Sequence, residues 1–365
     1  MQPDPKVLDV FEVTVSPAPD LQARSVVVME PRAVGGVEPD AAPDSVGVSL
    51  DDRFDVRINA FLPAQDNHLF NEPDFFRLHA GSGNDIYAQL VRAADSRVCA
   101  TLGFHESDDR VFASLRRGTF GGLGLNQAVE IQLLDRFLDV VTDRLRDAGA
   151  RAMEIKCAPF SHDVASVSIA SSLLLRRGAI VAGHDLNYDM RIDGRPFVDR
   201  VGYGNAKRIR KCRREGFVAE TLDRPRYGAA YELIRDNRTR RGYPTSMTSE
   251  QLDAMAATFP DRLHYFAVYP DVKRSRMVAA AVCMAITDQV LYVFYWGDAA
   301  DMGVYSPIAL LAASIYEFAQ HRGFALLDVG TATVGGVPNH GLVTFKRNLG
   351  FSESLKLSFR WRLEQ

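Results

Sequence analysis

The spacing of hydrophobic residues along the chain predicts one order of strands and helices that occurs twice. In the first copy, residues 85–192, three strands are followed by a glycine-rich loop, a long helix, a strand, a second helix and a last strand. The second copy, residues 263–363, repeats this order. Strands are expected at residues 86–93, 98–105 and 111–115 in the first copy, and at residues 263–269, 277–286, 290–296 and 325–329 in the second. Because the match runs through seven elements, and a glycine follows each helix, we interpret it as a duplication of a mixed α/β unit.

The junction between the third strand and the first helix of the second copy has the clearest pattern. Residues 290–296 alternate as a buried strand does, and Ser306 and Pro307 then occupy the N-cap and first helical positions of a helix. A helix that begins where a central strand ends directs N–H groups and the positive end of its dipole into a crevice. This junction is a candidate phosphate site with Ser306 as a contact. A turn that merely connects two elements is the alternative.

The glycine-rich loop of the first copy, residues 116–125, precedes a helix expected to begin near Asn126. Neither loop matches the phosphate-binding loop of nucleotide hydrolases or the fingerprint of dinucleotide-binding folds, which excludes nucleotide hydrolysis and hydride transfer. No Ser-His-Asp or Cys-His arrangement has an informative spacing, which argues against a covalent nucleophile. The four cysteines are scattered without metal-type spacing, so we expect no structural zinc and a reducing, cytoplasmic environment.

Length and composition divide the chain into three regions. The 365 residues correspond to about two domains, and 47% hydrophobic with 24% charged residues is ordinary for a globular protein. No apolar stretch is long enough to span a membrane, and the N-terminus lacks the pattern of a secretion signal. Residues 1–60 are expected to form a β-rich appendage, with strands at 7–15 and 25–29 and a mobile loop at 31–46. The two lobes are expected at residues 61–197 and 198–365.

A dense basic cluster lies between the two copies. It comprises Lys207, Arg208, Arg210, Lys211, Arg213 and Arg214, and the arginines Arg235, Arg238, Arg240 and Arg241 follow. Guanidinium groups bind phosphate oxygens in pairs, and clustered positive charge attracts polyanions. Arg208, Arg210 and Arg238 are therefore candidate contacts to a phosphate-containing ligand, with a solvated helix face as the alternative.

Several segments of the second half resemble a known family. They are Tyr305-Ser306-Pro307, the segment 323–330 that ends in Asp328-Val329-Gly330, the segment 344–351 that contains Phe345-Lys346, and the basic segment 205–211. Together with the order of elements they resemble the acyltransferase fold of the GNAT superfamily, and the tandem arrangement resembles the Fem-type (FemAB-like) transferases, which build peptidoglycan cross-bridges. The likeness covers residues 61–365. One departure is that the coenzyme A signature of ordinary acetyltransferases is absent from both loops.

The resemblance implies transfer of an acyl group onto an amine. We expect an N-acyltransferase with acyl-CoA as donor and a small-molecule or cell-wall-precursor amine as acceptor. An aminoacyl-tRNA is the alternative donor, which the basic cluster and the missing coenzyme A signature favour, and a non-catalytic RNA or polysaccharide binder is a further alternative. The transfer needs a neutral amine, hydrogen-bond donors for the carbonyl oxygen and a proton for the leaving group. No metal ion is expected.

Four residues are candidates for catalysis. Asp328 ends a strand, where open sheets bind ligands, and can accept a proton or hold the acceptor amine; capping a local turn or pairing with Lys346 is the alternative. The resemblance points to Lys346, which can polarise the carbonyl or orient a phosphate, although a lysine on a helix is often solvated. His340 titrates in a useful range, with a surface histidine as the alternative. Tyr305 can donate a proton to the leaving group.

Aromatic side chains are expected at the mouth of the same site. Tyr295 and Trp296 end the strand that precedes the Ser306 junction. Their rings can stack on a base of the donor. Core packing is the alternative for both residues.

Overall fold

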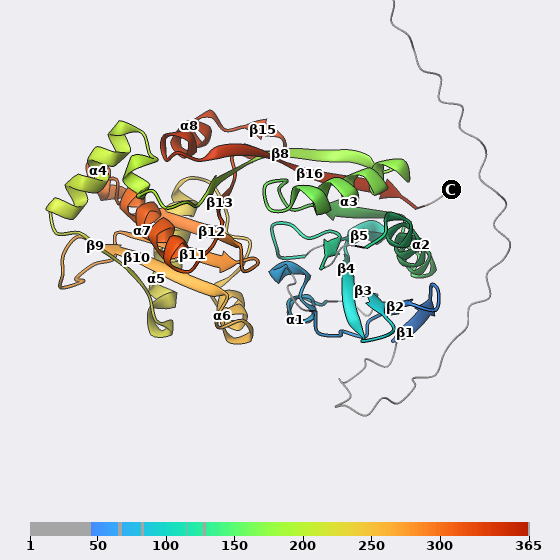
Figure 1. Ribbon diagram of the computed structural model, residues 1–365. Helices are drawn as coiled ribbons and strands as arrows, with labels where there is room; N and C mark the ends of the chain where they lie inside the picture. The colour runs from blue at the N-terminus through green and yellow to red at the C-terminus, as the bar shows by residue number, and fades with distance from the viewer. Residues whose placement is uncertain (1–44, 65–67, 82–83, 115, 127–128, 364–365) are drawn as a thin grey trace, which may run out of the picture.

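The computed structural model describes residues 45–64, 68–81, 84–114, 116–126 and 129–363. The chain forms two lobes that lie side by side and are bridged by two long strands, β8 (Ile180–Arg191) and β16 (Ser352–Arg362) (Figure 1). The strands expected at 7–15 and 25–29, and nearly all of the loop expected at 31–46, fall outside the described residues. No helix in the described ranges is both long and apolar enough to cross a bilayer.

One mixed sheet runs through both lobes, in the order β1-β2-β3-β4-β5-β7-β16-β8-β13-β12-β11-β10-β9. The first lobe contributes β1 (Val46–Ser49), β2 (Phe54–Ile58), β3 (Ile86–Arg92), β4 (Arg97–Glu106), β5 (Val111–Ala113), β6 (Gly124–Leu125, beside β4) and β7 (Ala152–Lys156). The second contributes β9 (Val218–Thr221), β10 (Leu263–Tyr269), β11 (Ala279–Ala285), β12 (Val290–Asp298) and β13 (Leu326–Thr331), with a small hairpin of β14 (Thr333–Val334) and β15 (Val337–Pro338). The pairs β5–β7 and β12–β13 are parallel, so each lobe has one parallel pair at the same place in its element order.

Strands β8 and β16 tie the lobes together because each pairs across the boundary. The last residues of β16 pair with β7 of the first lobe, from Ser358 opposite Lys156 to Arg362 opposite Ala152. Strand β8 pairs along β16 and also with β13 of the second lobe. Separating the lobes would therefore break backbone hydrogen bonds of a continuous sheet, which is costly in a buried ladder.

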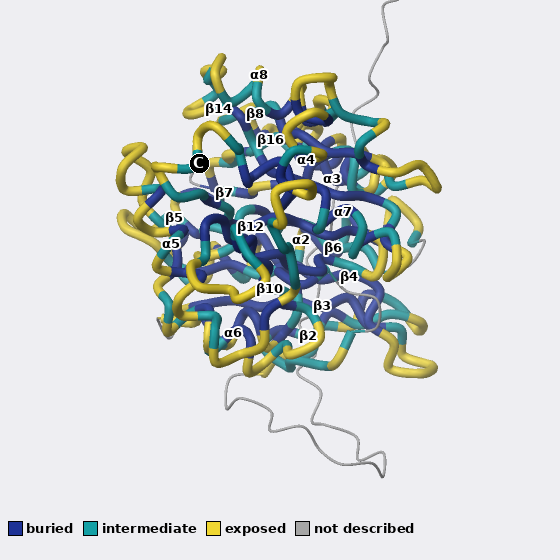
Figure 2. The backbone as a smooth tube through the Cα atoms, turned by 90° about the vertical axis from the view of Figure 1, so that its left-hand side faces the viewer, coloured by how far each residue is buried: buried dark blue, intermediate teal, exposed yellow. Residues whose placement is uncertain are grey.

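Helices cover both faces of the sheet. They are α1 (Pro73–Leu78), α2 (Ile131–Asp147), α3 (Val164–Arg176), α4 (Tyr203–Arg214), α5 (Tyr227–Arg240), α6 (Ser249–Thr258), α7 (Pro307–His321) and α8 (His340–Asn348). In the second lobe α4 and α7 pack on one face and α5 and α6 on the other, and successive residues of β11 alternate between the two cores, as the period of a strand requires. The buried backbone is concentrated along these central strands, and the exposed segments are the loops around them (Figure 2).

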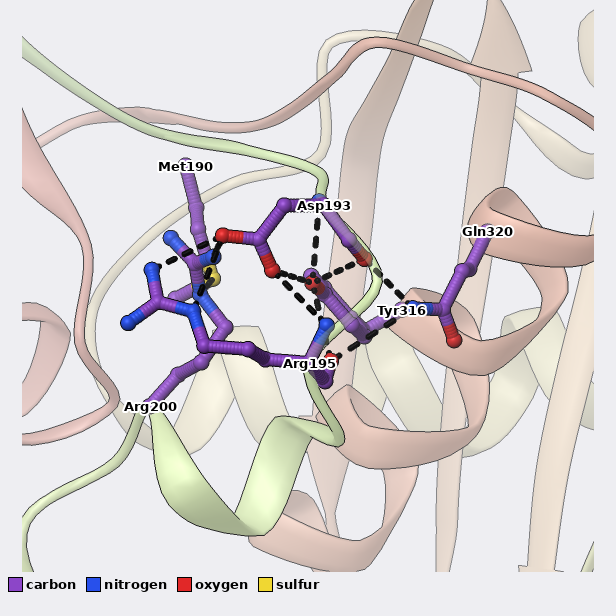
Figure 3. A network of polar contacts seen from close by, with 6 residues as sticks. All are labelled: Met190, Asp193, Arg195, Arg200, Tyr316 and Gln320. Atoms are coloured by element: carbon purple, nitrogen blue, oxygen red, sulfur yellow. Dashed lines mark hydrogen bonds and ion pairs between the residues drawn. The ribbon is translucent and has the colours of Figure 1, made fainter.

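The segment between β8 and α4 is held on helix α7 by a polar network (Figure 3). The Asp193 carboxylate accepts hydrogen bonds from the guanidinium groups of Arg195 and Arg200. The hydroxyl of Tyr316, a fully buried side chain of α7, lies 3.3 Å from the Asp193 carbonyl oxygen, and Gln320 donates to the same carbonyl. The connection between the lobes is thus anchored to the second lobe.

The strands and helices expected from the sequence agree with this fold, with one difference in the first lobe. The helix expected near Asn126 begins at Ile131, because Gly124 and Leu125 first form β6 beside β4. The first glycine-rich loop therefore does not lead directly from a strand into a helix. Short elements such as α1 and β9 were not expected, since four to six residues carry too little periodicity to be recognised.

Candidate active site between strands β12 and β13

The parallel strands β12 and β13 diverge and open a cavity in the second lobe. They are paired only where Val290–Tyr292 lie opposite Leu326–Asp328. Beyond this point a cavity of about 690 Å³ opens between them. In the first lobe Gly121, from the loop after β5, pairs with Cys157 just beyond the end of β7, so the chain itself occupies the corresponding place. The cavity belongs to the parallel pair of the second lobe.

Residues from both faces of the sheet line the cavity. Asn237, Arg238 and Ser246 line it from the α5 and α6 side, whereas Ser306 and Phe345 line it from the α7 and α8 side. A cavity lined by residues from both faces of the sheet can hold two reactants next to each other, as a transfer between two substrates needs.

Lys346 is a buried lysine at the wall of this cavity. Only 2% of the residue is exposed, and its Nζ donates to the carbonyl oxygens of Gly330 and Thr331, both at 2.8 Å. Burial lowers the pKa of Lys346 to about 7, against the opposing effect of the negative charge of Asp328. An ammonium group has three N–H donors and the two carbonyls take two of them, so one is left for a ligand.

Gly330 shapes the turn that holds Lys346. Its φ of +75° is a conformation that side-chain-bearing residues rarely adopt. Its N–H donates to Oδ1 of Asp328 at 2.6 Å, and its carbonyl accepts from Lys346. The two charged side chains are therefore connected through one glycine.

Asp328 lies behind the cavity and is fully buried. Besides the Gly330 N–H, its carboxylate contacts Nε2 of His162 at 2.6 Å and accepts from Nδ2 of Asn187 at 3.0 Å. Two N–H donors and a histidine ring nitrogen thus surround this carboxylate. Asp328 is not among the residues that line the cavity. Of the interpretations made from the sequence, Asp328 fits the alternative one, since it binds the local turn at Gly330.

Aromatic residues form the rest of the wall. Tyr295 and Trp296 both line the cavity. The Tyr295 hydroxyl accepts from the backbone N–H groups of Ser246 and Met247 at 2.7 and 3.0 Å, and the Arg238 guanidinium lies 5.0 Å from the centre of its ring. The Trp296 ring packs edge-on against Phe345, with 5.8 Å between ring centres. These contacts fix the wall next to Lys346.

The turn before α7 offers fewer N–H donors than the sequence suggests. The N–H groups of Tyr305 and Ser306 both donate to the Met302 carbonyl, and Pro307 has no N–H. Ser306 occupies the N-cap position with a φ of +51° and no side-chain cap bond, a strained backbone of the kind found at functional sites. Ser306 lines the cavity, but its turn is a poor anion cradle.

Known structures share this architecture, whereas sequence comparison finds nothing: no family model and no curated protein matches the chain. The structure of FemX superposes with a TM-score of 0.63 at 13% identity, over 82% of this chain and 93% of FemX. The chain has a Fem-type fold, the fold of FemX. L-PGS from Bacillus licheniformis matches with a TM-score of 0.52 at 10% identity, over 77% of this chain and 84% of that one. A conserved protein of unknown function from Bacteroides thetaiotaomicron matches with a TM-score of 0.52 at 13% identity, over 83% and 95%.

The Fem-type fold places the other residues expected at the site outside the cavity. His340 is exposed at the start of α8, and neither it nor Tyr305 lines the cavity. Tyr305 packs instead against Phe217 and below the Lys211 ammonium group. Arg208 and Arg210 are exposed on α4, and Arg208 donates to Asn205. Lys346, Tyr295, Trp296, Ser306 and Arg238 are the expected residues that the cavity brings together.

Sequence reasoning missed the part of the site that comes from the first lobe. His162 and Asn187 both contact Asp328. A lone histidine in a loop and a lone asparagine in a strand carry no motif that could have identified them. No group of three potential metal-ligating His, Cys, Asp or Glu side chains occurs among the described residues.

Proposed function

We propose that the chain transfers an acyl or aminoacyl group from an activated ester or thioester to an amine bound in the β12–β13 cavity. The buried ammonium group of Lys346, held by two carbonyls and left with one free N–H, is the observation that carries the proposal. A tandem GNAT-like fold of the Fem type is an acyl- or aminoacyl-transferase fold, which agrees with this chemistry. The acceptor is a cell-wall precursor or a small-molecule amine.

In this reaction Lys346 stabilises the carbonyl oxygen. A neutral amine attacks the carbonyl carbon, and the oxygen gains negative charge that the third N–H of Lys346 can meet. The new C–N bond forms as the C–O or C–S bond to the leaving group breaks. The amine loses one proton and the leaving group takes one up. Asp328 does not touch the reactants in this scheme; it holds the turn that places Lys346.

The surroundings of the cavity favour an aminoacyl-tRNA over acyl-CoA as the donor. Helix α4 lies between two elements that line the cavity: the N–H of Gly202 and the side chain of Asn205 bond to Asn348 at the end of α8, and Cys212 donates to the carbonyl of Tyr305 before α7. Its exposed residues Lys207, Arg208 and Arg210 have no carboxylate partner in the described ranges. The N–H groups of the Tyr305–Ser306 turn are also already bonded, which leaves few donors for the pyrophosphate of coenzyme A.

Acyl-CoA is the second candidate donor. The observation in its favour is the splay of β12 from β13, because the slot between two diverging strands can admit a long thin chain next to a reactive carbonyl. On the opposite face, Arg238 and Arg241 stand at the α5 side of the cavity and suit an anionic group of the acceptor.

We propose further that the first lobe, residues 61–197, and the second lobe, residues 198–365, act as one unit in the cytoplasm. The support is the continuous sheet across the lobes and the four cysteine thiols, all of them buried and unpaired.

Charge reversal on α4 tests the donor. The double variant Arg208→Glu/Arg210→Glu is expected to weaken binding of aminoacyl-tRNA by about tenfold or more at moderate salt. It is also expected to reduce the slope of log affinity against log salt by about one to two, since about one counterion is released per phosphate contact. Filter binding across a salt series measures both effects, and transfer to hydroxylamine measures turnover.

Arg146→Glu is the matched control, because Arg146 is an exposed arginine on helix α2 of the first lobe. It is expected to leave binding and salt slope unchanged. Full turnover with acyl-CoA in the double variant, together with no binding of tRNA by the wild type, would make acyl-CoA the donor. Binding of tRNA without transfer of any acyl group would leave only the non-catalytic binder.

The pH dependence of transfer tests the charge on Lys346. The ammonium form is the active one in our proposal, and burial lowers the pKa of Lys346 to about 7. Raising the pH through this value removes the charge, so kcat/KM is expected to fall above about pH 7 when hydroxylamine, already neutral there, is the acceptor. In Lys346→Arg the guanidinium stays charged, and the residual activity should lack this fall. A rate that rises through pH 7 in the wild type alone would instead make Lys346 a proton acceptor.

A further inference from the structure

A buried contact between the lobes lies directly behind the cavity. His162 follows β7 in the first lobe, and its Nε2 lies 2.6 Å from Oδ2 of Asp328 on β13 of the second lobe. The two side chains are 4% and 0% exposed. His162 does not line the cavity, so any role in the reaction must act through Asp328.

We propose that His162 is a positioning residue: from the first lobe it holds Asp328, and through Asp328 the Gly330–Thr331 turn that presents Lys346 to the cavity. Each step of this connection is a hydrogen bond. Asp328 Oδ1 accepts from the Gly330 N–H at 2.6 Å, and the Gly330 carbonyl accepts from Lys346 Nζ at 2.8 Å. The first lobe thereby becomes part of the site in the second.

The contact is chemically specific and is not only packing. His162 stands edge-on to Phe120, with 5.0 Å between ring centres, and lies beside His68 at 6.2 Å. Nδ1 of His162 is buried and has no partner in the described part of the chain, so its polar contact there is the one to Asp328.

Several other groups act on this connection. Lys356, Asp189 and Tyr292 lie close enough to Asp328 for electrostatic interaction. Asn187 donates to its carboxylate from β8, and Lys346 stands 5.5 Å from the centre of the Tyr188 ring. Asn187, Asp189, Tyr188 and Lys356 belong to the shared strands β8 and β16. Among the described residues, His162 is thus the hydrogen-bond partner of Asp328 that comes from the first lobe and not from a shared strand.

Loss of the imidazole therefore has a defined consequence for Lys346. Without its His162 partner, the buried Asp328 carboxylate is no longer held towards Gly330. Lys346 then loses support from the negative charge that favours its ammonium form. The midpoint of Lys346 protonation is expected to fall by about one unit, which lowers the ammonium fraction at pH 7 by about fivefold.

The experiment measures the protonation of Lys346 directly. The inference therefore rests on the proposed function only for the predicted change in kcat/KM. The full chain is treated with p-nitrophenyl acetate between about pH 5.5 and 9, and acetylation of the Lys346 peptide is followed by mass spectrometry. In His162→Phe the midpoint of Lys346 modification should fall by about one unit, and the alkaline fall of kcat/KM should move with it. His162→Gln keeps an N–H donor towards Asp328 and should restore at least half of the shift.

His68→Phe is the matched control. His68 belongs to the same aromatic group, yet both its ring nitrogens are buried without a partner in the described ranges, so the variant should leave the Lys346 midpoint unchanged. An unchanged midpoint in His162→Phe, or an equal shift in His68→Phe, overturns the inference. If His162→Phe shifts the Lys346 midpoint but the wild type transfers no acyl group, the proposed function is overturned and the role of His162 stands.

Discussion

Lys346→Met is expected to lower kcat for acyl transfer by about 10²- to 10³-fold, the range found when one donor to a developing oxyanion is removed. Methionine fills nearly the same space along the cavity wall and carries no charge. The variant loses the two bonds to the Gly330 and Thr331 carbonyls, but it also removes the cost of a buried cation, so the unfolding temperature should change little. Single-turnover transfer from the donor to hydroxylamine is the measurement.

Lys356→Met is the matched control for this prediction. Lys356 is a second buried lysine, 6% exposed, whose Nζ donates to the Thr119 carbonyl at 3.0 Å. It does not line the cavity. Lys356 acts on Asp328 only through space and has no bond to it in the described ranges, so its replacement should leave kcat within about threefold of the wild type. Equal losses in the two variants would show that the effect comes from removing a buried charge and not from the reaction.

Asp328→Ala is expected to lower the free energy of unfolding by about 3–5 kcal/mol, because it leaves three buried groups without a hydrogen-bond partner, each at a cost of about 1–3 kcal/mol. The substitution leaves His162, Asn187 and the Gly330 N–H without their acceptor in a region closed to water. Because His162 and Asn187 come from different elements, the loss also loosens the contact between the lobes. Urea unfolding followed by circular dichroism measures the change.

Two further variants separate stability from activity at Asp328. Asp193→Ala removes a carboxylate with arginine partners on an exposed segment, and its effect on unfolding should be much smaller. Asp328→Asn keeps one acceptor oxygen but no charge, so turnover should fall well beyond any change in thermal stability. Equal loss of stability and turnover in Asp328→Asn would make the residue purely structural.

Much of the fold could be predicted from the sequence, because the spacing of hydrophobic residues within an element depends on that element alone. Alternation along residues 290–296 and the spacing of Ile308, Leu311 and Ile315 each report which face of one element is buried. These patterns located β10, β12, α7 and β13 to within about two residues, as expected for periodic segments. The start of α2 was misplaced because a glycine-rich stretch gives no signal for the short strand β6 that precedes the helix.

The candidate site was predictable in part. Four residues from the motifs of the second copy line the cavity: Tyr295, Trp296, Ser306 and Lys346. The turn before α7 was expected to offer its N–H groups to a phosphate. The fold instead bonds two of them to the Met302 carbonyl, an outcome that depends on a backbone conformation no residue pattern specifies.

The sequence alone determined the duplication, the mixed α/β lobes and the residues around the second strand-to-helix junction, because each depends on periods and motifs that lie within one segment. Tertiary structure decided which copy opens its strands, that β16 completes the sheet of the first lobe, and that His162 meets Asp328 across the boundary. Burial is a property of the assembled chain. Only the packing of both lobes around Lys346 could turn an ordinary helix lysine into a cation whose pKa lies near 7.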